Sequence, residues 1–289
     1  MFAYEAVKGF FWQDEPGTDP ATFDHISSNF GLIERSYPET RHSDTRVTQW
    51  QRFYDYLEHL IASSPSNVTY KLIYMGRHGE GEHNVAEALY GTNAWDDYWS
   101  KLDGDGTLFW SDAHLTSVGQ AQAREARAFM QKQIQTQKMP APQSYYVSPL
   151  YRCLQTANLT FGGLELPADG QFRPVIKEML REVLGVHTCD RRSSRTAILH
   201  DFPNWTFELG FQENDRLWRA NHRETWDEHD ARERALLSDI FTNDPNPVIS
   251  FTAHSGTIAS LLRVTKHRVF ALPTGALIPV LVKAIKIVT

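Results

Sequence analysis

Short apolar runs that alternate with helical patterns are the feature that most constrains the fold of this chain. Each run is three to six residues long and is rich in β-branched, aromatic or other apolar residues, as expected of buried strands. The predicted strands are 70–75, 145–147, 174–176 and 247–252. The predicted helices, where apolar residues recur every three or four positions, are 48–62, 116–137, 150–159, 224–241 and 255–264, with a short helix from residue 83.

This alternation predicts an α/β fold with three layers, in which a mostly parallel central sheet is flanked by helices. All 289 residues are expected to form one domain. Residues 1–68 are polar, aromatic-rich and weakly periodic, and are expected to be an N-terminal extension packed on the core. Residues 91–112 are rich in Trp, Asp and Gly and are expected to be a loop insertion near the active site. Residues 276–288 are expected to end the chain with one or two strands.

Charge and composition exclude several classes of protein. The chain has 29 Lys and Arg against 35 Asp and Glu, a net charge of −6, which argues against nucleic-acid binding. A small phosphorylated substrate needs only a local basic pocket and is compatible with this balance. No apolar stretch is long enough for a membrane span, and the first residues do not resemble a signal peptide. The two cysteines, Cys153 and Cys189, are predicted to be free thiols in the cytoplasm. The sequence leaves the oligomeric state open.

Three predicted strands end in residues suited to bind an anion. Arg77 and His78 follow the first strand, Arg152 follows the second, and His254 follows the last. Because the carboxyl ends of parallel strands meet at one edge of a sheet, these side chains are expected to share a pocket. Two guanidinium groups and the N-termini of the following helices favour a phosphoryl group, and a neutral imidazole held there can attack phosphorus.

The motifs around these residues resemble the histidine phosphatase superfamily, which includes cofactor-dependent phosphoglycerate mutases and many small-molecule phosphatases. The form of the first motif resembles a fungal branch of phosphomutase-like proteins. The matching segments occur in the family's order and are Arg77-His78-Gly79 with Asn84, Leu115-Thr116-x-x-Gly119, Ser148-Pro149-Leu150-x-Arg152 and His254-Ser255-Gly256. The resemblance covers about residues 70–264.

The resemblance implies a role for each matching residue. His78 would be the nucleophile that forms a phosphohistidine intermediate, without a metal or other cofactor. The phosphoryl group and substrate would be held by Arg77, Arg152 and His254 together with Asn84 and Ser255. Arg191 is a further candidate for substrate binding, with a solvated helix start as its alternative role.

The leaving oxygen needs an acid, and the family places a carboxylate between the second and third motifs. Glu182 is the preferred candidate because it lies just before Gly185 and a turn-like segment. Glu178 and Glu80 are the alternatives. His187 and Cys189 suggest a metal site only weakly, because no second pair of ligands follows them, and no metal is expected.

We therefore expect a phosphoric monoester hydrolase that acts on a small-molecule phosphate. Dedicated phosphoglycerate mutases share a Glu-Arg-x-Tyr-Gly segment, and Glu182-Val183-Leu184-Gly185 replaces it here. This difference favours a phosphatase and leaves a phosphomutase as the second hypothesis. A weakly catalytic protein that binds or senses a phosphometabolite is the third. A lipid-like or aromatic phosphate is compatible with the aromatic segment 95–110.

Overall fold

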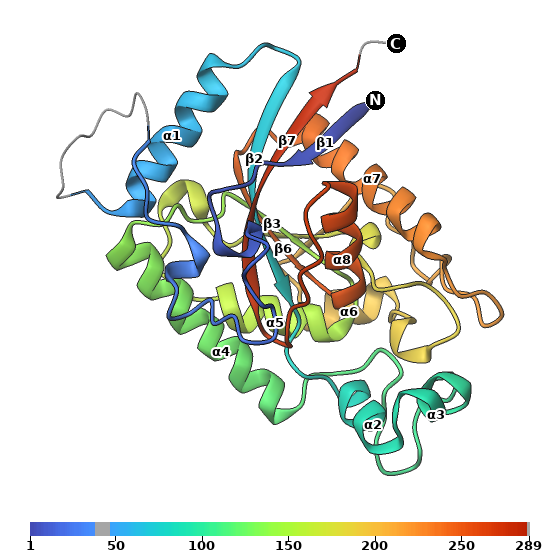
Figure 1. Ribbon diagram of the computed structural model, residues 1–289. Coiled ribbons are helices and arrows are strands. Elements are labelled where there is room, and N and C mark those ends of the chain that lie inside the picture. The colour runs from blue at the N-terminus through green and yellow to red at the C-terminus, as the bar shows by residue number, and fades with distance from the viewer. Residues whose placement is uncertain (38–46, 288–289) are drawn as a thin grey trace.

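The computed structural model describes residues 1–37 and 47–287, which form a sheet covered by helices on both faces (Figure 1). The sheet has seven strands in the order β1-β7-β2-β6-β3-β4-β5. Their bounds are β1 Phe2–Ala6, β2 Val68–Arg77, β3 Ser144–Val147, β4 Pro174–Ile176, β5 Thr206–Phe207, β6 Val248–Ala253 and β7 Leu277–Lys286.

Parallel pairing dominates the sheet. The pairs β2–β6, β6–β3, β3–β4 and β4–β5 are parallel, whereas β7 is antiparallel to both β2 and β1. The carboxyl ends of β2, β3 and β6 therefore lie at the same edge, as adjacent strands. The predicted three-layer α/β fold with a mostly parallel sheet is confirmed.

The alternation of side chains along β2 shows how the two outer layers form. Leu72 and Tyr74 are fully buried in a cluster with α1, α4 and α5, whereas Ile73 and Met75 are fully buried in a second cluster with α7 and α8. Figure 1 shows α1 and α4 on one side of the sheet and α7 and α8 on the other. The bounds are α1 Gln49–Ser63, α2 Glu82–Tyr90, α3 Thr92–Asp97, α4 Ser117–Lys132, α5 Tyr151–Phe161, α6 Arg195–Asp201, α7 Trp226–Asn243 and α8 Ser255–Val264.

Several elements differ from the expectation. β1 was not predicted, because only its pairing with β7 makes this segment a strand. The segment 91–112, expected to be a loop, contains α3 and buries Trp95 and Trp110 with their ring centroids 5.4 Å apart. The helix predicted to reach residue 137 ends at Lys132 and continues as one π turn. The C-terminal segment forms one strand, and residue 288 lies outside the described residues.

The N-terminal segment packs on the sheet through aromatic side chains. Phe11 and Phe30 have no exposed surface, and both lie within ring contact of Trp50 in α1. Phe30 also contacts Tyr74 of β2, with 5.4 Å between ring centroids. Within the described ranges, every helix is too short or too polar to cross a bilayer.

Candidate active site

The first motif lies where β2 ends, and two glycines bring it against α4. His78 donates its backbone N–H to Ala253 O, which holds it beside the end of β6. Gly79 and Gly119 lie so close that a Cβ on Gly79 would collide with the backbone of Gly119, and a Cβ on Gly119 with that of Glu80. The glycines of two separate motifs are therefore explained by one close approach of backbones.

The His78 imidazole is neutral and has a defined tautomer. Its Nδ1 lies 2.7 Å from Gly79 O, and since a carbonyl only accepts, Nδ1 carries the hydrogen. Burial, followed by the charges of Arg152 and Arg77, holds the pKa of His78 well below 6.5. The lone pair is therefore on Nε2, which is the state a histidine nucleophile requires.

His78 lines a polar cavity of about 250 Å³ together with Arg77, Arg152 and Glu182. Arg77 donates to Leu272 O at 2.7 Å, which fixes its guanidinium group at the cavity wall. Its Nε and the Nε of Arg152 are buried and have no hydrogen-bond partner within residues 1–37 and 47–287. Buried donors are normally paired, so these two are suited to an anionic ligand.

Asp190 fixes the second arginine. Its two carboxylate oxygens each accept from a guanidinium group, from Arg152 at 2.9 Å and from Arg223 at 2.9 Å. Burial opposes ionisation of Asp190, but the charges of Arg223 and Arg152 outweigh it and lower its pKa below the usual value. Arg152 also donates to Cys189 O at 2.6 Å. The guanidinium plane of Arg152 is therefore held before any ligand arrives.

His254 is fully buried and lies beside His78 rather than among the residues that line the cavity. The two imidazole centroids are 5.1 Å apart. Its Nε2 is 2.8 Å from Ser148 Oγ, and Cys153 Sγ lies 3.4 Å from the same nitrogen. Burial, Arg152 and His78 lower the pKa of His254 well below 6.5. His254 is therefore a neutral neighbour that supports His78.

The Glu182 carboxylate lies at the N-terminus of α8. One oxygen accepts from Gly256 N at 3.0 Å and the other from Val183 N at 2.9 Å, while Ser255 Oγ is 3.4 Å away. A Cβ on Gly256 would collide with this carboxylate, so only glycine admits it. Glu178 instead pairs with Arg192 and Arg181, and Glu80 accepts from Thr116 Oγ1; neither lines the cavity.

The remaining predicted residues fall into two groups. Asn84 and Ser255 line the cavity, and the Asn84 amide also accepts from Gly81 N at the start of α2. Arg191 is not among the lining residues. Its guanidinium group donates to Asp103 at 2.7 Å and to Ser111 at 2.9 Å.

Comparison of the sequence with known proteins identifies its family. The sequence profile of the histidine phosphatase superfamily (branch 1) matches residues 99–272, more than half of the chain. The chain belongs to this superfamily. A protein from Arthroderma benhamiae with the name "Probable phosphoglycerate mutase" is 50% identical over 283 residues, covering 97% of this chain and 84% of the relative. That alignment extends over most of the sequence before residue 99.

Two further fungal relatives are more distant. "Phosphomutase-like protein 3" from Candida albicans is 34% identical over 280 residues, covering 96% of this chain and 79% of the relative. "Probable phosphoglycerate mutase PMU1" from Saccharomyces cerevisiae is 34% identical over 300 residues, covering 96% of this chain and 95% of the relative. The predicted membership of the superfamily, with relatives in a fungal phosphomutase-like branch, is confirmed.

Sequence reasoning missed several residues that line the polar cavity. Arg223 lies in an irregular segment that follows no predicted strand, so no motif identifies it. His83 also lines the cavity, and its Nδ1 is buried without a partner within the described ranges. Trp95 packs within its own segment and lines the cavity as well.

One group of residues beside the polar cavity has the spacing of a metal site. Ligand atoms of His187, Cys189 and Asp190 all lie within 4.8 Å of one another. Both carboxylate oxygens of Asp190 are already bound to guanidinium groups, and burial raises the pKa of the Cys189 thiol well above 9.0. A cation here would displace an arginine and need a thiolate that the site disfavours, so the donor set does not fit a metal.

The neutral histidines of the site make stability depend on pH. His78, His83 and His254 all have pKa values held well below 6.5, chiefly by burial. Below pH 6.5 the unfolded chain takes up protons at these positions and the folded protein does not, so acid favours unfolding. Each histidine contributes up to about 1.4 kcal/mol per pH unit. Burial raises the pKa of Glu233 well above 4.5. Glu233 therefore acts in the opposite direction and offsets part of the loss of stability in acid.

We expect the free energy of unfolding to fall by on the order of 3 kcal/mol between pH 7 and pH 5. Urea denaturation at intervals of half a pH unit measures the loss. His83→Asn should make the pH dependence shallower by about one proton, because it removes one of the three groups. A free energy of unfolding that stays constant from pH 7 to pH 5 would contradict the neutral state of the site.

Proposed function

We propose that this protein is a phosphatase that hydrolyses a small-molecule phosphate monoester through a phosphohistidine intermediate. The observation that carries the proposal is the neutral His78 imidazole, with its lone pair on Nε2, in one cavity with Arg77 and Arg152. A nucleophile and two fixed cations meet the requirements of phosphoryl transfer to an imidazole.

In the proposed first step, His78 Nε2 attacks phosphorus and the bond from phosphorus to the ester oxygen breaks. Glu182, in its protonated form at this step, donates a proton to the departing oxygen and becomes a carboxylate, and Arg77 and Arg152 offset the charge on the transferring group. Water then attacks phosphohistidine and gives its proton to the Glu182 carboxylate, which releases inorganic phosphate and restores both groups. His254 packs beside the His78 imidazole, with 5.1 Å between ring centroids.

The names of the relatives favour a phosphomutase as the second candidate. A mutase must hold a second group of its substrate while it returns the phosphoryl group. The Arg and Tyr of the Glu-Arg-x-Tyr-Gly segment are missing at 183–185, which supports hydrolysis. Phosphate release from p-nitrophenyl phosphate and a panel of phosphorylated metabolites, without added metal, tests the proposal. Rapid isomerisation of a phosphoglycerate with negligible phosphate release would reject it in favour of the mutase.

We also propose that the enzyme acts in the cytoplasm. Cys153 and Cys189 are both free and buried, a state that a reducing compartment maintains.

Glu182→Gln should slow the enzyme most on substrates with poor leaving groups. An alkyl oxygen needs a proton as it departs, whereas p-nitrophenolate does not, so loss of the acid should cost about 10²- to 10³-fold on alkyl phosphates and much less on the aryl phosphate. Single-turnover rates of phosphoenzyme formation on both substrates measure the difference.

The matched control is Glu80→Gln, which changes the alternative carboxylate near the first motif. It should lower both rates equally or not at all. Equal losses on both substrates in Glu182→Gln would remove Glu182 from the acid role.

A further inference from the structure

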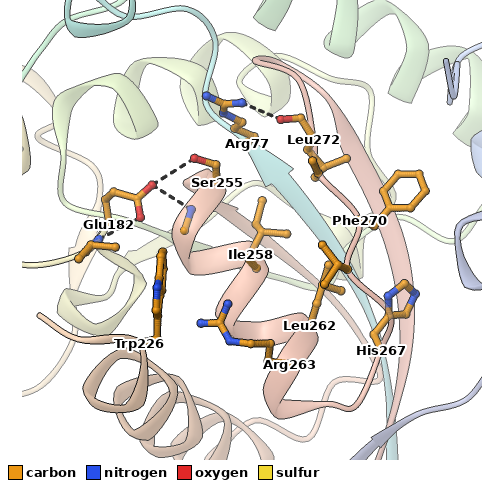
Figure 2. A pocket seen from close by; sticks show the side chains of 15 residues that line it. Arg77, Glu182, Trp226, Ser255, Ile258, Leu262, Arg263, His267, Phe270 and Leu272 are labelled. Carbon is orange, nitrogen blue, oxygen red and sulfur yellow. Dashed lines mark hydrogen bonds between the residues drawn. The ribbon is translucent and has the colours of Figure 1, made fainter. Parts of the chain in front are cut away.

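A second cavity, of about 430 Å³, lies along α8 (Figure 2) and shares lining residues with the polar cavity. Figure 2 shows Arg77, Glu182 and Ser255 at one end of it and Arg263 and His267 toward the other. Its volume is in the range of small-molecule binding sites.

The surface of this cavity is mainly apolar. Nine of its fifteen lining residues have apolar side chains, contributed by the loop after Glu182, the start of α7, α8 and the segment 269–272. Four of them, labelled in Figure 2, are Ile258, Leu262, Phe270 and Leu272. An apolar concave surface of this kind gains free energy when a hydrocarbon covers it.

The charged side chains of the cavity wall away from the junction already have partners. Arg263 donates to Asp230 at 2.6 Å and lies over the Trp226 ring. The two ring nitrogens of His267 also have partners. Its Nε2 lies 3.0 Å from Asp14 Oδ1, and its Nδ1 lies 2.7 Å from Arg268 O. The Arg263 and His267 side chains at that end therefore already have acidic partners within the protein.

The two cavities share three residues, which are Arg77, Glu182 and Ser255. Arg77 belongs to the proposed phosphoryl site, and Glu182 is the proposed donor of a proton to the departing oxygen. The leaving group begins at that oxygen. A substrate whose phosphorus faces His78 and whose ester oxygen faces Glu182 would direct its leaving group toward the apolar cavity.

We propose that the apolar cavity binds the leaving group of the substrate, and that the substrate is a phosphate monoester of a hydrophobic alcohol. This inference rests on the proposed phosphatase function, because the proposed acid joins the two cavities. It makes the hydrocarbon part of the substrate, rather than a second charged group, the source of specificity.

A series of n-alkylphosphonates from ethyl to octyl tests this directly, because phosphonates carry the dianion and the chain but are not hydrolysed. Isothermal titration calorimetry measures their dissociation constants. We expect the dissociation constant to fall by about fourfold for each added methylene until the cavity is filled. A dissociation constant independent of chain length in the wild-type protein would overturn the proposal.

Two variants locate the effect. Ala259→Trp places an indole in the cavity, and Val269→Asp places a carboxylate in its wall at a position that is 76% exposed and therefore safe for folding. Both should abolish the dependence on chain length. Ala128→Trp, at an exposed position of α4, is the matched control and should retain it. An unchanged dependence in both Ala259→Trp and Val269→Asp would show that the chain binds elsewhere and would overturn the proposal.

Turnover of p-nitrophenyl phosphate separates this inference from the proposed function. If the protein hydrolyses p-nitrophenyl phosphate but binds all the phosphonates equally, the proposal of a hydrophobic substrate is rejected and the proposed phosphatase function is retained. An inactive protein with a graded series that the two variants abolish would reject the phosphatase and keep a site for amphiphilic phosphates.

Discussion

His78→Ala should lower kcat for p-nitrophenyl phosphate by on the order of 10⁴-fold or more, because it removes the atom that accepts the phosphoryl group. His78 is 2% exposed and packs against His83 and His254, with centroid distances of 5.4 and 5.1 Å. The loss should appear in kcat rather than only in KM. Burst kinetics on the wild-type protein, with acid-labile label retained on the chain, measure the intermediate directly.

The control for this variant is His200→Ala, since the His200 side chain is 85% exposed and outside the site. This variant should keep kcat within about twofold of the wild type, because substitutions of exposed residues away from the active site usually have small effects. A His78→Ala protein that is folded and retains a tenth or more of the wild-type kcat would show that another group is the nucleophile.

Asp190→Asn should have the largest effect on stability, because it leaves Arg152 and Arg223 without their shared carboxylate. The Arg152 side chain is 1% exposed and that of Asp190 is 3% exposed, and removal of one partner of such a buried pair costs about 3–5 kcal/mol. Without this partner Arg152 also loses its fixed orientation, so we expect kcat/KM to fall by about 10²-fold. Urea denaturation and steady-state kinetics measure the two effects.

Asp103→Asn is the matched control, because Asp103 forms an arginine pair of similar length at the surface. The Arg191–Asp103 distance is 2.7 Å, but the two side chains are 38% and 53% exposed. Exposed pairs contribute about 0–1 kcal/mol, so this variant should remain close to the wild type in stability. Similar losses in the two variants would mean that burial does not decide the effect of Asp190.

The residues that carry the proposed chemistry were predictable because they lie next to strands. Arg77, His78 and Arg152 each follow a run of buried apolar residues, and parallel pairing of β2, β6 and β3 brings these strand ends together. Their grouping therefore needed only local patterns and one rule of sheet geometry. Family resemblance supplied Glu182, which the structure places at the same cavity.

Other parts of the site required the folded chain. Asp190 and Arg223 are 33 positions apart, in segments that lack helical or strand periodicity, and their pairing has no sequence pattern. The exact position of His254 was also not predictable. The sequence places it at the end of the last strand, and the fold buries it beside His78, in contact with Ser148 and Cys153.

The sequence by itself determined the three-layer fold, the superfamily and the strand-end residues, because strand and helix periodicity and short motifs are local properties of a chain. Only the tertiary structure decided that β1 joins the sheet, that Asp190 holds two arginines, and that an apolar cavity opens beside Glu182. These features depend on which distant segments pack together, and that contact is set by the shape of the whole core rather than by the residues nearby in sequence.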